Sequence, residues 1–440
     1  MIQTAMPRPW RRAVAWLAAL APLFYLTYGV ANFLASQHAQ VSAIVFDWER
    51  QVPFLAWTIF PYWSINAFYG ASLFVCRTRD ELDRHGKRLL TAQLLAVTFF
   101  IVAPLRFSWP KPATEGLAGF MFDALAGFDK PFNQAPSLHI ALAVILWELY
   151  RRHVPRWALW PLHLWFLLIC ASVLTTYQHH FIDIPTGALL GLICLWLWPD
   201  EHDAPLARWT MTGERKRRAL ALRYGIGALA IAALALWVNG IALWLMWISV
   251  SLLLVALAYA AIGVESFQKF DHGGHSLAAR WLFLPYRIGA WINSRAWTFG
   301  QAPSVAVTDE VSIGRFPIDT EARRLAVVDV TAELAAPRGA RRWESVAMLD
   351  LVMPTPAALA DAAAAIERAR RAGPVLVCCA LGYSRSAASV ATWLVASGQA
   401  VDAQGAIATI RRVRPQIVLD DRAAAAISAA VPQARRQAWQ

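Results

Sequence analysis

The chain has 440 residues, of which 58% are hydrophobic, and its mean hydropathy is +0.41; these values argue against a single soluble domain and for membrane-spanning segments. The net charge of +12 does not indicate nucleic-acid binding, because the Lys and Arg residues cluster between apolar runs, where membrane topology and anionic lipid headgroups explain them. Five cysteines without framework spacing argue against a disulfide scaffold and against zinc held by cysteine.

Eight apolar stretches are each long enough to cross a bilayer, which takes about 20 residues per span. They begin near Ala13, Val52, Leu89, Leu138, Trp157, Ile184, Leu222 and Ile241. Basic residues gather before span one and after spans two, four and six, at Arg8, Arg11, Arg12, Arg77, Arg79, Arg84, Lys87, Arg88, Arg151, Arg152, Arg156, Arg208, Arg215, Lys216, Arg217 and Arg218. This positive-inside pattern predicts an integral, multi-pass protein with both termini in the cytoplasm, which we place in a bacterial inner membrane.

Two short segments carry histidines at the ends of predicted spans. Residues 136–139 (PSLH) open the fourth span, and residues 179–183 (HHFID) join the fifth to the sixth. The predicted topology places both segments at the outer surface. Ionisable groups at membrane depth are costly and usually functional, so their convergence indicates a site.

The spacing of these residues suits phosphoryl chemistry. Asp183, four residues after His179, could orient one imidazole and stabilise its charged form, which leaves the other nitrogen to attack phosphorus. His139 could then protonate the leaving oxygen. The alternative is that these residues are ordinary polar residues at the membrane interface. We interpret His180 in this way, as a residue that faces lipid headgroups. A metal site of two His and one Asp is the weaker option, since no further carboxylate or Cys lies near in sequence.

These elements resemble the type 2 phosphatidic acid phosphatase superfamily over spans one to six. PSLH together with HHFID is most similar to its inositol phosphorylceramide and sphingomyelin synthase branch. The resemblance implies that His179 is a phosphohistidine nucleophile, Asp183 its partner and His139 the acid. It also implies hydrolysis of a lipid phosphate or transfer of a phosphoryl headgroup between lipids.

The chain departs from that superfamily where phosphate should be bound. Its first motif, a Lys and a later Arg-Pro, is approximated by Arg106 and Lys111, which we expect to contact the substrate. Val173 stands where the superfamily has Arg, and Leu138 stands where it has Gly.

Residues 201–303 connect the two predicted catalytic regions. They begin with a basic loop and continue with two spans that meet at an Asn-Gly turn, residues 238–240. Trp and Arg residues then mix from about residue 264 to residue 303. This composition predicts an interfacial linker that holds the tail at the membrane, or a packed extension of the soluble domain.

A phosphate-sized cradle is predicted near the C-terminus, where Arg385 follows Cys379 by six residues. The five intervening residues include Gly382 and let backbone N–H groups converge on an anion, while the following helix adds its positive end. The same field would hold Cys379 as a thiolate. The alternative for Cys379 is a small buried hydrophobe.

The sequence on both sides of the cradle fits this prediction. Residues 374–379 read as a short apolar strand, and residues 384–396 read as a helix. Arg385 can hold phosphate oxygens in a bidentate manner. The Ser386 hydroxyl could assist loss of the thiolate when a phosphocysteine is hydrolysed.

This run resembles the active-site loop of the dual-specificity (Cys-based) phosphatase family, over residues 304–431, with further strands at 311–314 and 325–330. The resemblance implies Asp350 as the general acid, since it lies 29 positions before the nucleophile, with Gly382 and Ser384 binding substrate. A turn or capping carboxylate ahead of a helix over 354–371 is the alternative for Asp350. Cys378 replaces the family's His, either as a buried side chain or as half of a vicinal disulfide.

The sequence therefore predicts a multi-pass α-helical membrane bundle joined to a soluble α/β phosphatase-like domain. Residues 1–200 form the six-span domain, 201–263 the basic loop and two spans, 264–303 the linker and 304–440 the cytoplasmic domain. We expect a bifunctional phosphatase that needs no cofactor or metal, acting on phospholipid and on phosphoprotein or a phosphorylated lipid headgroup. A catalytically weakened sensor or scaffold is the alternative; a transporter is a third possibility, although no pair of broken helices is evident.

Overall fold

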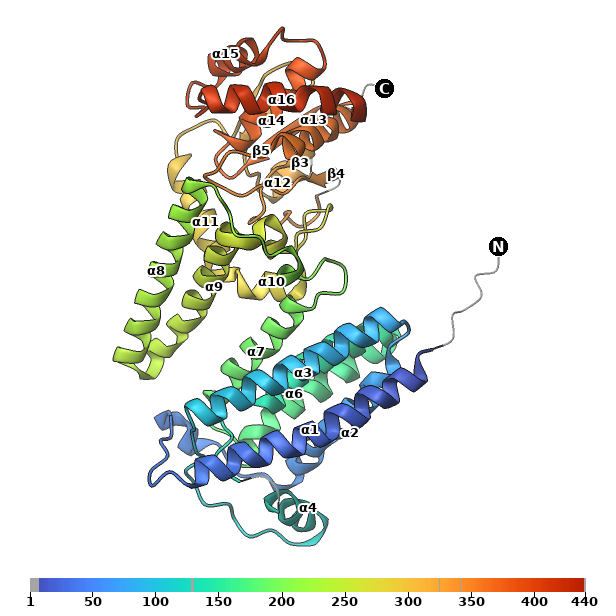
Figure 1. The fold of residues 1–440 in the computed structure, drawn as a ribbon, viewed down its shortest axis with the longest axis vertical. Coiled ribbons are helices and arrows are strands. Elements are labelled where there is room, and N and C mark those ends of the chain that lie inside the picture. The colour runs from blue at the N-terminus through green and yellow to red at the C-terminus, as the bar shows by residue number, and fades with distance from the viewer. Residues whose placement is uncertain (1–7, 128–129, 324, 341, 439–440) are drawn as a thin grey trace. The chain divides into compact units, whose positions relative to one another are not determined.

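A computed structural model describes residues 8–127, 130–323, 325–340 and 342–438. The chain divides into two compact units, residues 1–204 and residues 205–440 (Figure 1). Each unit carries one of the two predicted catalytic regions and is described by itself.

The first unit is a helical bundle built around one central helix. Its helices are α1 (Trp10–Ser36), α2 (Ile59–Val75), α3 (Arg79–Val102), α4 (Gly116–Ala126), α5 (Leu138–His153), α6 (Leu159–Thr175) and α7 (Asp183–Leu197). Helix α5 contacts α2, α3, α6 and α7 and is buried over most of its length. Because Ser137 caps α5 and Asp183 opens α7, both predicted histidine segments lie at helix starts.

Four helical segments of the described chain are long and apolar enough to cross a membrane: 10–36, 156–175, 215–238 and 240–267. The other predicted spans also fold as helices, but they are shorter or carry more charge. Eight spans therefore stay a prediction.

Two helices start at other residues than the apolar stretches of the predicted spans, and capping explains the second case. The second predicted span begins near Val52, whereas α2 starts at Ile59, after 3₁₀ turns over residues 47–51 and 56–58. The third begins near Leu89, whereas α3 starts at Arg79, because the Thr78 hydroxyl accepts the N–H of residue 81 at 3.2 Å. The basic residues assigned to a loop there lie largely within α3.

A buried arginine ties α3 to the end of α7. Arg88 is 1% exposed; its Nη2 pairs with an Asp200 carboxylate oxygen at 2.8 Å, and its Nε donates to the Trp198 carbonyl at 2.8 Å. A buried cation keeps its charge only with such partners. The charge therefore serves packing as well as topology.

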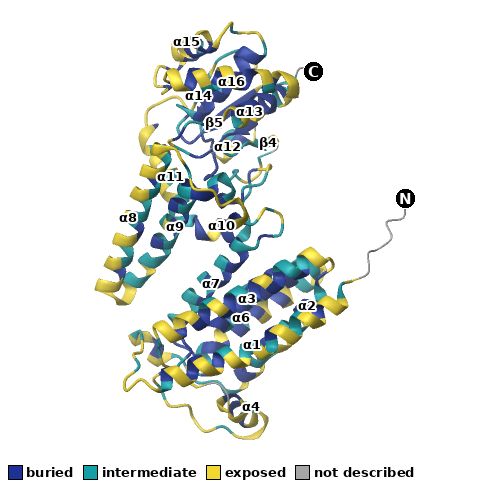
Figure 2. Cartoon of the chain, in the orientation of Figure 1, coloured by how far each residue is buried: buried dark blue, intermediate teal, exposed yellow. Residues whose placement is uncertain are grey.

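The second unit opens with a helical hairpin of α8 (Arg215–Val238) and α9 (Leu245–Leu257). The reversal occurs at Asn239 and Gly240, whose φ angles are +59° and +54°, as the Asn-Gly pair predicts. Helix α8 leaves most of its apolar residues exposed (Figure 2). Such a large exposed apolar surface is typical of a membrane or a partner interface.

The same unit contains a five-stranded sheet with strand order β1-β2-β5-β3-β4. The strands are β1 (Ser304–Ala306), β2 (Val311–Arg315), β3 (Ala326–Asp329), β4 (Arg342–Ser345) and β5 (Val375–Cys379). Only the β1–β2 pair among these strands is antiparallel. The strands predicted at 311–314, 325–330 and 374–379 are confirmed as β2, β3 and β5.

One face of this sheet is covered by helices α13 (Pro356–Arg370), α14 (Arg385–Ala396), α15 (Ala403–Val413) and α16 (Asp421–Ala438), with the short α12 (Asp319–Ala322) after β2. These helices enclose a core that includes the fully buried Trp393. Small residues on α13 and α14 let the helices approach closely, so strand β5 and its loop are held between rigid layers.

The opposite face of the sheet is covered by residues from the segment 264–303. Helices α10 (Leu277–Leu282) and α11 (Leu284–Trp297) lie in this segment, and Ala290 packs on the cluster around Phe316. Lys269 Nζ pairs with the Asp329 carboxylate at 2.5 Å, and Ser345 N–H donates to the Asp271 carbonyl at 2.8 Å. The segment is thus packed on the sheet, while Trp291 and Trp297 on α11 stay exposed.

Candidate active sites

The predicted phosphate cradle is the turn between β5 and α14. Strand β5 ends at Cys379 and helix α14 begins at Arg385, so the loop points backbone N–H groups toward the sulfur from the helix start. Gly382 has a φ of +76°, and a Cβ atom there would lie 2.5 Å from the Gly314 carbonyl carbon. The position therefore needs glycine both for its conformation and for its close approach to β2.

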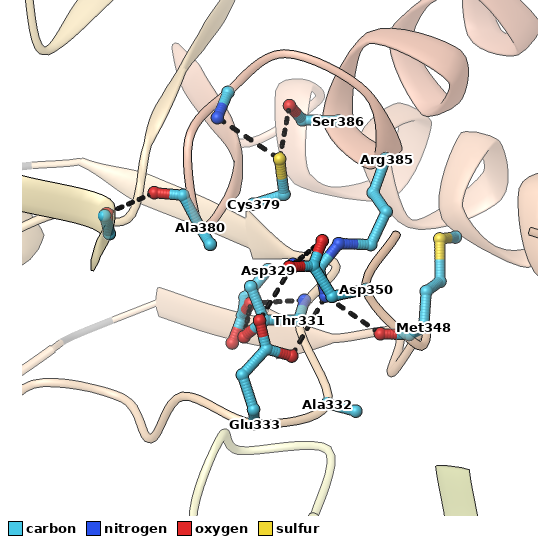
Figure 3. A network of polar contacts seen from close by, with 12 residues as sticks. Asp329, Thr331, Ala332, Glu333, Met348, Asp350, Cys379, Ala380, Arg385 and Ser386 are labelled. Carbon is cyan, nitrogen blue, oxygen red and sulfur yellow. Dashed lines mark hydrogen bonds and ion pairs between the residues drawn. The ribbon is translucent and has the colours of Figure 1, made fainter. Parts of the chain in front are cut away.

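The Cys379 sulfur receives two hydrogen bonds within this loop. The N–H of Gly382 donates to Sγ at 3.2 Å, and the Ser386 hydroxyl donates to Sγ at 3.3 Å (Figure 3). Cys379 is 3% exposed and lies at the positive end of α14. Ser384 occupies the N-cap position, and its carbonyl accepts the N–H of residue 388. Two hydrogen-bond donors and the start of a helix therefore surround the sulfur of the predicted nucleophile.

Arg385 is fully buried and pairs with two carboxylates. Its Nη1 and Nη2 atoms bind the two carboxylate oxygens of Glu333 at 3.0 and 2.8 Å, and Nη1 also donates to the Met348 carbonyl at 3.0 Å. Its Nη2 lies 2.9 Å from an Asp350 carboxylate oxygen (Figure 3). Burial alone would lower the pKa of Arg385, but the two carboxylates outweigh it and raise the pKa well above its usual value. The guanidinium is therefore a fixed cation beside the Cys379 loop.

The two carboxylates beside Arg385 differ in their protonation. Burial alone would raise the pKa of Glu333, but the charge and hydrogen bonds of Arg385 outweigh it, so the pKa is lowered. Burial, together with the neighbouring Glu333 charge, raises the pKa of Asp350 even though Arg385 opposes the shift. Two nearby carboxylates whose pKa values move apart are typical of an acid and its electrostatic partner.

Asp350 does not cap the following helix. The N-cap of α13 is Thr355, whose hydroxyl accepts the N–H of residue 358 at 3.2 Å, so the capping alternative for Asp350 is wrong. Asp350 instead lies in the loop after β4, with its side chain 33% exposed, next to Leu351 at a φ of +59°. The family resemblance of the sequence extends to Glu333 but assigned this residue no role, and its pairing with Arg385, 52 positions away, was not predicted.

Cys378 is a buried side chain, which is the first of the two alternatives that the sequence indicated. It is 0% exposed and packs with Phe316, Leu334 and Leu376. Burial, followed by the negative charge of Asp329, raises the pKa of its thiol well above the usual value. Cys378 and Cys379 form no disulfide in the described part of the chain.

The predicted histidine cluster of the first unit comes together at the starts of α5 and α7. His179 Nδ1 lies 3.0 Å from an Asp183 carboxylate oxygen, and His179 Nε2 lies 3.4 Å from the Ser137 hydroxyl. The same Asp183 oxygen accepts the N–H of His180 at 3.2 Å. Asp183 is 0% exposed and His179 is 5% exposed, so this carboxylate fixes the orientation of the imidazole.

His139 and His179 line one cavity of about 300 Å³. The remaining lining is largely apolar and aromatic and includes Tyr28, Tyr62 and Leu142. The His139 ring stacks on Tyr62, with ring centroids 4.1 Å apart. Its Nε2 atom is buried and has no hydrogen-bond partner among the described residues. An apolar pocket with two convergent imidazoles suits an amphipathic substrate with one polar group.

His180 does not face headgroups, which corrects the interpretation made from the sequence. It is 2% exposed; its Nδ1 lies 3.0 Å from a Glu49 carboxylate oxygen, and its Nε2 lies 2.8 Å from the Ser108 hydroxyl. Glu49 also accepts the N–H of Phe181 at 2.9 Å. These contacts hold the loop that carries His179, and sequence reasoning missed Glu49 because it lies far away along the chain.

The two residues proposed to bind phosphate in the first unit lie in the segment between α3 and α4. Lys111 Nζ donates to the Gln178 side-chain oxygen at 2.8 Å, which brings it next to the His179 loop. Arg106 is exposed, its backbone N–H donates to the Ser42 carbonyl, and no described contact joins its guanidinium to the histidine cluster. No group of three or more metal-binding side chains is found among the described residues.

Comparisons with known proteins give matches only among solved structures. No protein-family model and no curated protein matches the chain. The structure of Tk-PTP in its active form is 22% identical and covers 30% of this chain and 97% of its own, with a TM-score of 0.27. PTPMT1 in complex with PI(5)P is 17% identical and covers 31% and 99%, with a TM-score of 0.27. Human DUSP28 is 22% identical and covers 31% and 94%, with a TM-score of 0.24. None of these three is a type 2 phosphatidic acid phosphatase, so that resemblance stays a prediction.

Proposed function

We propose that the unit of residues 205–440 hydrolyses phosphomonoesters through Cys379. The observation that carries this proposal is the arrangement of one sulfur with two hydrogen-bond donors, a fixed arginine and a carboxyl group of raised pKa around a loop at a helix start. Nucleophile, electrostatic clamp and acid are the parts that phosphoryl transfer needs.

The reaction would run in two steps. The Cys379 sulfur bonds to phosphorus as the P–O bond to the leaving group breaks, and Asp350 gives its proton to the leaving oxygen. Water then attacks the phosphocysteine and returns a proton to Asp350 while the S–P bond breaks. The Ser386 hydroxyl, 3.3 Å from the sulfur, stabilises the departing thiolate. Arg385 neutralises the phosphoryl oxygens in both steps.

The substrate would be a phosphorylated lipid headgroup or a phosphoprotein. The hairpin of α8 and α9 belongs to the same compact unit and has the length and composition of membrane spans. A site tethered to the bilayer meets membrane-bound substrates at a raised effective concentration, which favours the lipid headgroup.

Phosphate release by the purified full chain tests this proposal. The substrates are aryl phosphates, phosphopeptides and phospholipid monoesters. Cys379→Ser should abolish the phosphate release that this site catalyses. Cys378→Ala, which changes a neighbouring residue without a catalytic role, should retain it. Equal release by wild type and Cys379→Ser would contradict the proposal. No release from any substrate would favour a phosphate-binding sensor or scaffold.

We further propose that the first unit acts on lipid phosphate through His179. The supporting observation is the cavity lined by both His139 and His179, with Asp183 behind His179. His179 Nε2 would bond to phosphorus as the P–O bond breaks, and His139 would protonate the leaving oxygen. Water would then complete hydrolysis, or a lipid hydroxyl would complete headgroup transfer.

Trapping labelled phosphate on the protein tests this second site. Label should appear on His179 and vanish in His179→Ala, while His163→Ala, whose ring accepts from the Trp147 indole, should keep it. Label on Ser137, which lies 3.4 Å from His179, would instead make the serine the nucleophile.

We also propose that the chain is inserted in a membrane with both termini in the cytoplasm. It rests on the four long apolar helices and on the distribution of basic residues along the chain. Protease protection of tagged termini in sealed vesicles tests the orientation.

A further inference from the structure

The loop that carries Asp350, here called the acid loop, is joined to the α8–α9 hairpin by a tyrosine. Tyr259 follows α9 within a single π-helical turn, residues 258–262, and is 1% exposed. Its hydroxyl donates a hydrogen bond of 2.8 Å to the backbone carbonyl of Asp350. Single π-helical turns occur frequently at functional sites.

Both helices of the hairpin hold this tyrosine in place. The ring of Tyr224, from α8, stacks on Tyr259 with ring centroids 5.6 Å apart and an interplanar angle of 15°. Arg217, at the start of α8, donates to the carbonyl of Tyr259 at 3.2 Å and to that of Ala258 at 3.3 Å. The hydroxyl of Tyr259 is therefore presented from a rigid support.

The acid loop has a conformation that needs such support. Leu351, directly after Asp350, has a φ of +59° and is 53% exposed, so little packing holds this left-handed residue. A left-handed conformation is unfavourable for a residue with a side chain. The Met348 carbonyl is held by Arg385, and the Asp350 carbonyl is held by Tyr259. Strained residues of this kind cluster at functional sites.

The charged groups facing the Asp350 carboxyl do not replace this hydrogen bond. Arg385 and Glu333 face it from the catalytic loops, and the positive charge of Lys216 acts on it from α8. These groups act on the carboxyl, whereas Tyr259 acts on the backbone that aims it. Removing the tyrosine hydroxyl would leave the charges in place and loosen the direction of the acid.

We propose that Tyr259 is a positioning residue for the general acid, so that the α8–α9 hairpin is part of the machinery that protonates the leaving group. The inference rests on the proposed Cys379-dependent hydrolysis. It assigns to the hairpin a role in the chemical step besides that of an anchor.

Tyr259→Phe in the full chain tests this inference, because it removes the hydroxyl and keeps the ring. Two substrates are compared: 4-nitrophenyl phosphate, a good leaving group, and phenyl phosphate, whose phenol has a pKa of about 10 like tyrosine. We expect kcat/KM for phenyl phosphate, which reports the steps up to departure of the leaving group, to fall about tenfold, as loss of one hydrogen bond predicts, with kcat/KM for the nitrophenyl ester nearly unchanged. Equal loss for both substrates, or loss for neither, overturns the inference.

A matched control and a double variant separate positioning from general damage. Tyr150→Phe is the matched control, because the Tyr150 hydroxyl also donates to a backbone carbonyl at 2.8 Å, that of Phe68 in the first unit, so its loss should change neither kcat/KM. In an Asp350→Asn background, adding Tyr259→Phe should cause no further loss, since the acid is already absent. A further tenfold loss there would overturn the inference. Retained release by Cys379→Ser would instead overturn the underlying hydrolase proposal.

Discussion

The two candidate sites differ in how far their polar atoms are already hydrogen-bonded within the protein. Around Cys379, Arg385 already binds Glu333 through both of its Nη atoms, and the sulfur already accepts two hydrogen bonds. Around His179, by contrast, His139 Nε2 and Asp183 Oδ1 are buried without a hydrogen-bond partner among the described residues. The first arrangement is a preorganised charge clamp, whereas the second leaves polar atoms for a bound group to satisfy.

The two sites also differ in how far apart in the sequence their residues lie. In the second unit, Cys379, Arg385 and Ser386 all fall within one stretch of eight residues, 379–386. In the first unit, the segments 137–139 and 179–183 meet only through the packing of α5 against α7. A charge clamp within one loop depends on local backbone geometry, so a substitution in it should reduce activity severely. A cluster assembled by helix packing depends on a few aligning contacts, so substitutions there should reduce activity by graded amounts.

The severest test of the charge clamp is Arg385→Lys. The substitution keeps one charge but loses the planar fork that binds Glu333 and would bind phosphate. We expect kcat/KM of the Cys379 reaction to fall about 1,000-fold, or about 4 kcal/mol in the transition state. Arg371→Lys, a surface arginine paired with Glu367, is the control and should change little. Steady-state kinetics with phenyl phosphate measure both. A drop smaller than about tenfold would argue against a clamp.

The contrast between contiguous and assembled sites explains what sequence could predict. Strands β2, β3 and β5 and helix α14 follow from local apolar patterns, and the Cys379 loop follows from residue spacing. The convergence of His139 and His179 on one cavity also agrees with the sequence expectation. The roles assigned to all these residues stay predictions until kinetics are measured.

Long-range partners could not be predicted in the same way. The pairings of Glu333 with Arg385, Glu49 with His180 and Tyr259 with Asp350 are set by tertiary packing, and the sequence around these residues does not indicate which partner each will contact. The third predicted span was counted from the apolar residues near Leu89, whereas helix α3 starts at Arg79, because the Thr78 cap sets the helix boundary and hydropathy does not. Patterns report local preference, whereas electrostatic partners are chosen by the fold.

The second test concerns the acid and its dependence on pH. The raised pKa of Asp350 keeps it protonated to higher pH than an ordinary aspartate, so kcat/KM for phenyl phosphate should fall only as pH rises through that pKa. Asp350→Asn should lower this kcat/KM about 100-fold and remove the fall on the alkaline side. The kcat/KM for 4-nitrophenyl phosphate should change much less. A pH profile of unchanged shape would remove Asp350 from the acid role.

The third test asks whether the histidine site depends on one aligning contact. Asp183→Asn keeps the shape but loses the charge that holds His179 Nδ1 at 3.0 Å. A charge-assisted hydrogen bond contributes about 2 kcal/mol, so we expect about a 30-fold loss of phosphate labelling rate at His179. Asp123→Asn, on the exposed side of α4, is the control. If both variants label like wild type, the alignment has no catalytic role.

The smallest effect separates backbone conformation from close packing at the Cys379 loop. Gly382 and Gly398 have φ angles of +76° and +79°, but only at Gly382 would an added Cβ meet backbone, 2.5 Å from Gly314. Gly398→Ala should therefore cost about 1 kcal/mol for its conformation alone. Gly382→Ala should cost a further 1–3 kcal/mol or so, because β2 and the loop must move apart. Thermal unfolding of the purified chain in detergent measures the two costs. Equal shifts would mean that the loop yields without strain, and a loop that yields could not hold its donors on the sulfur.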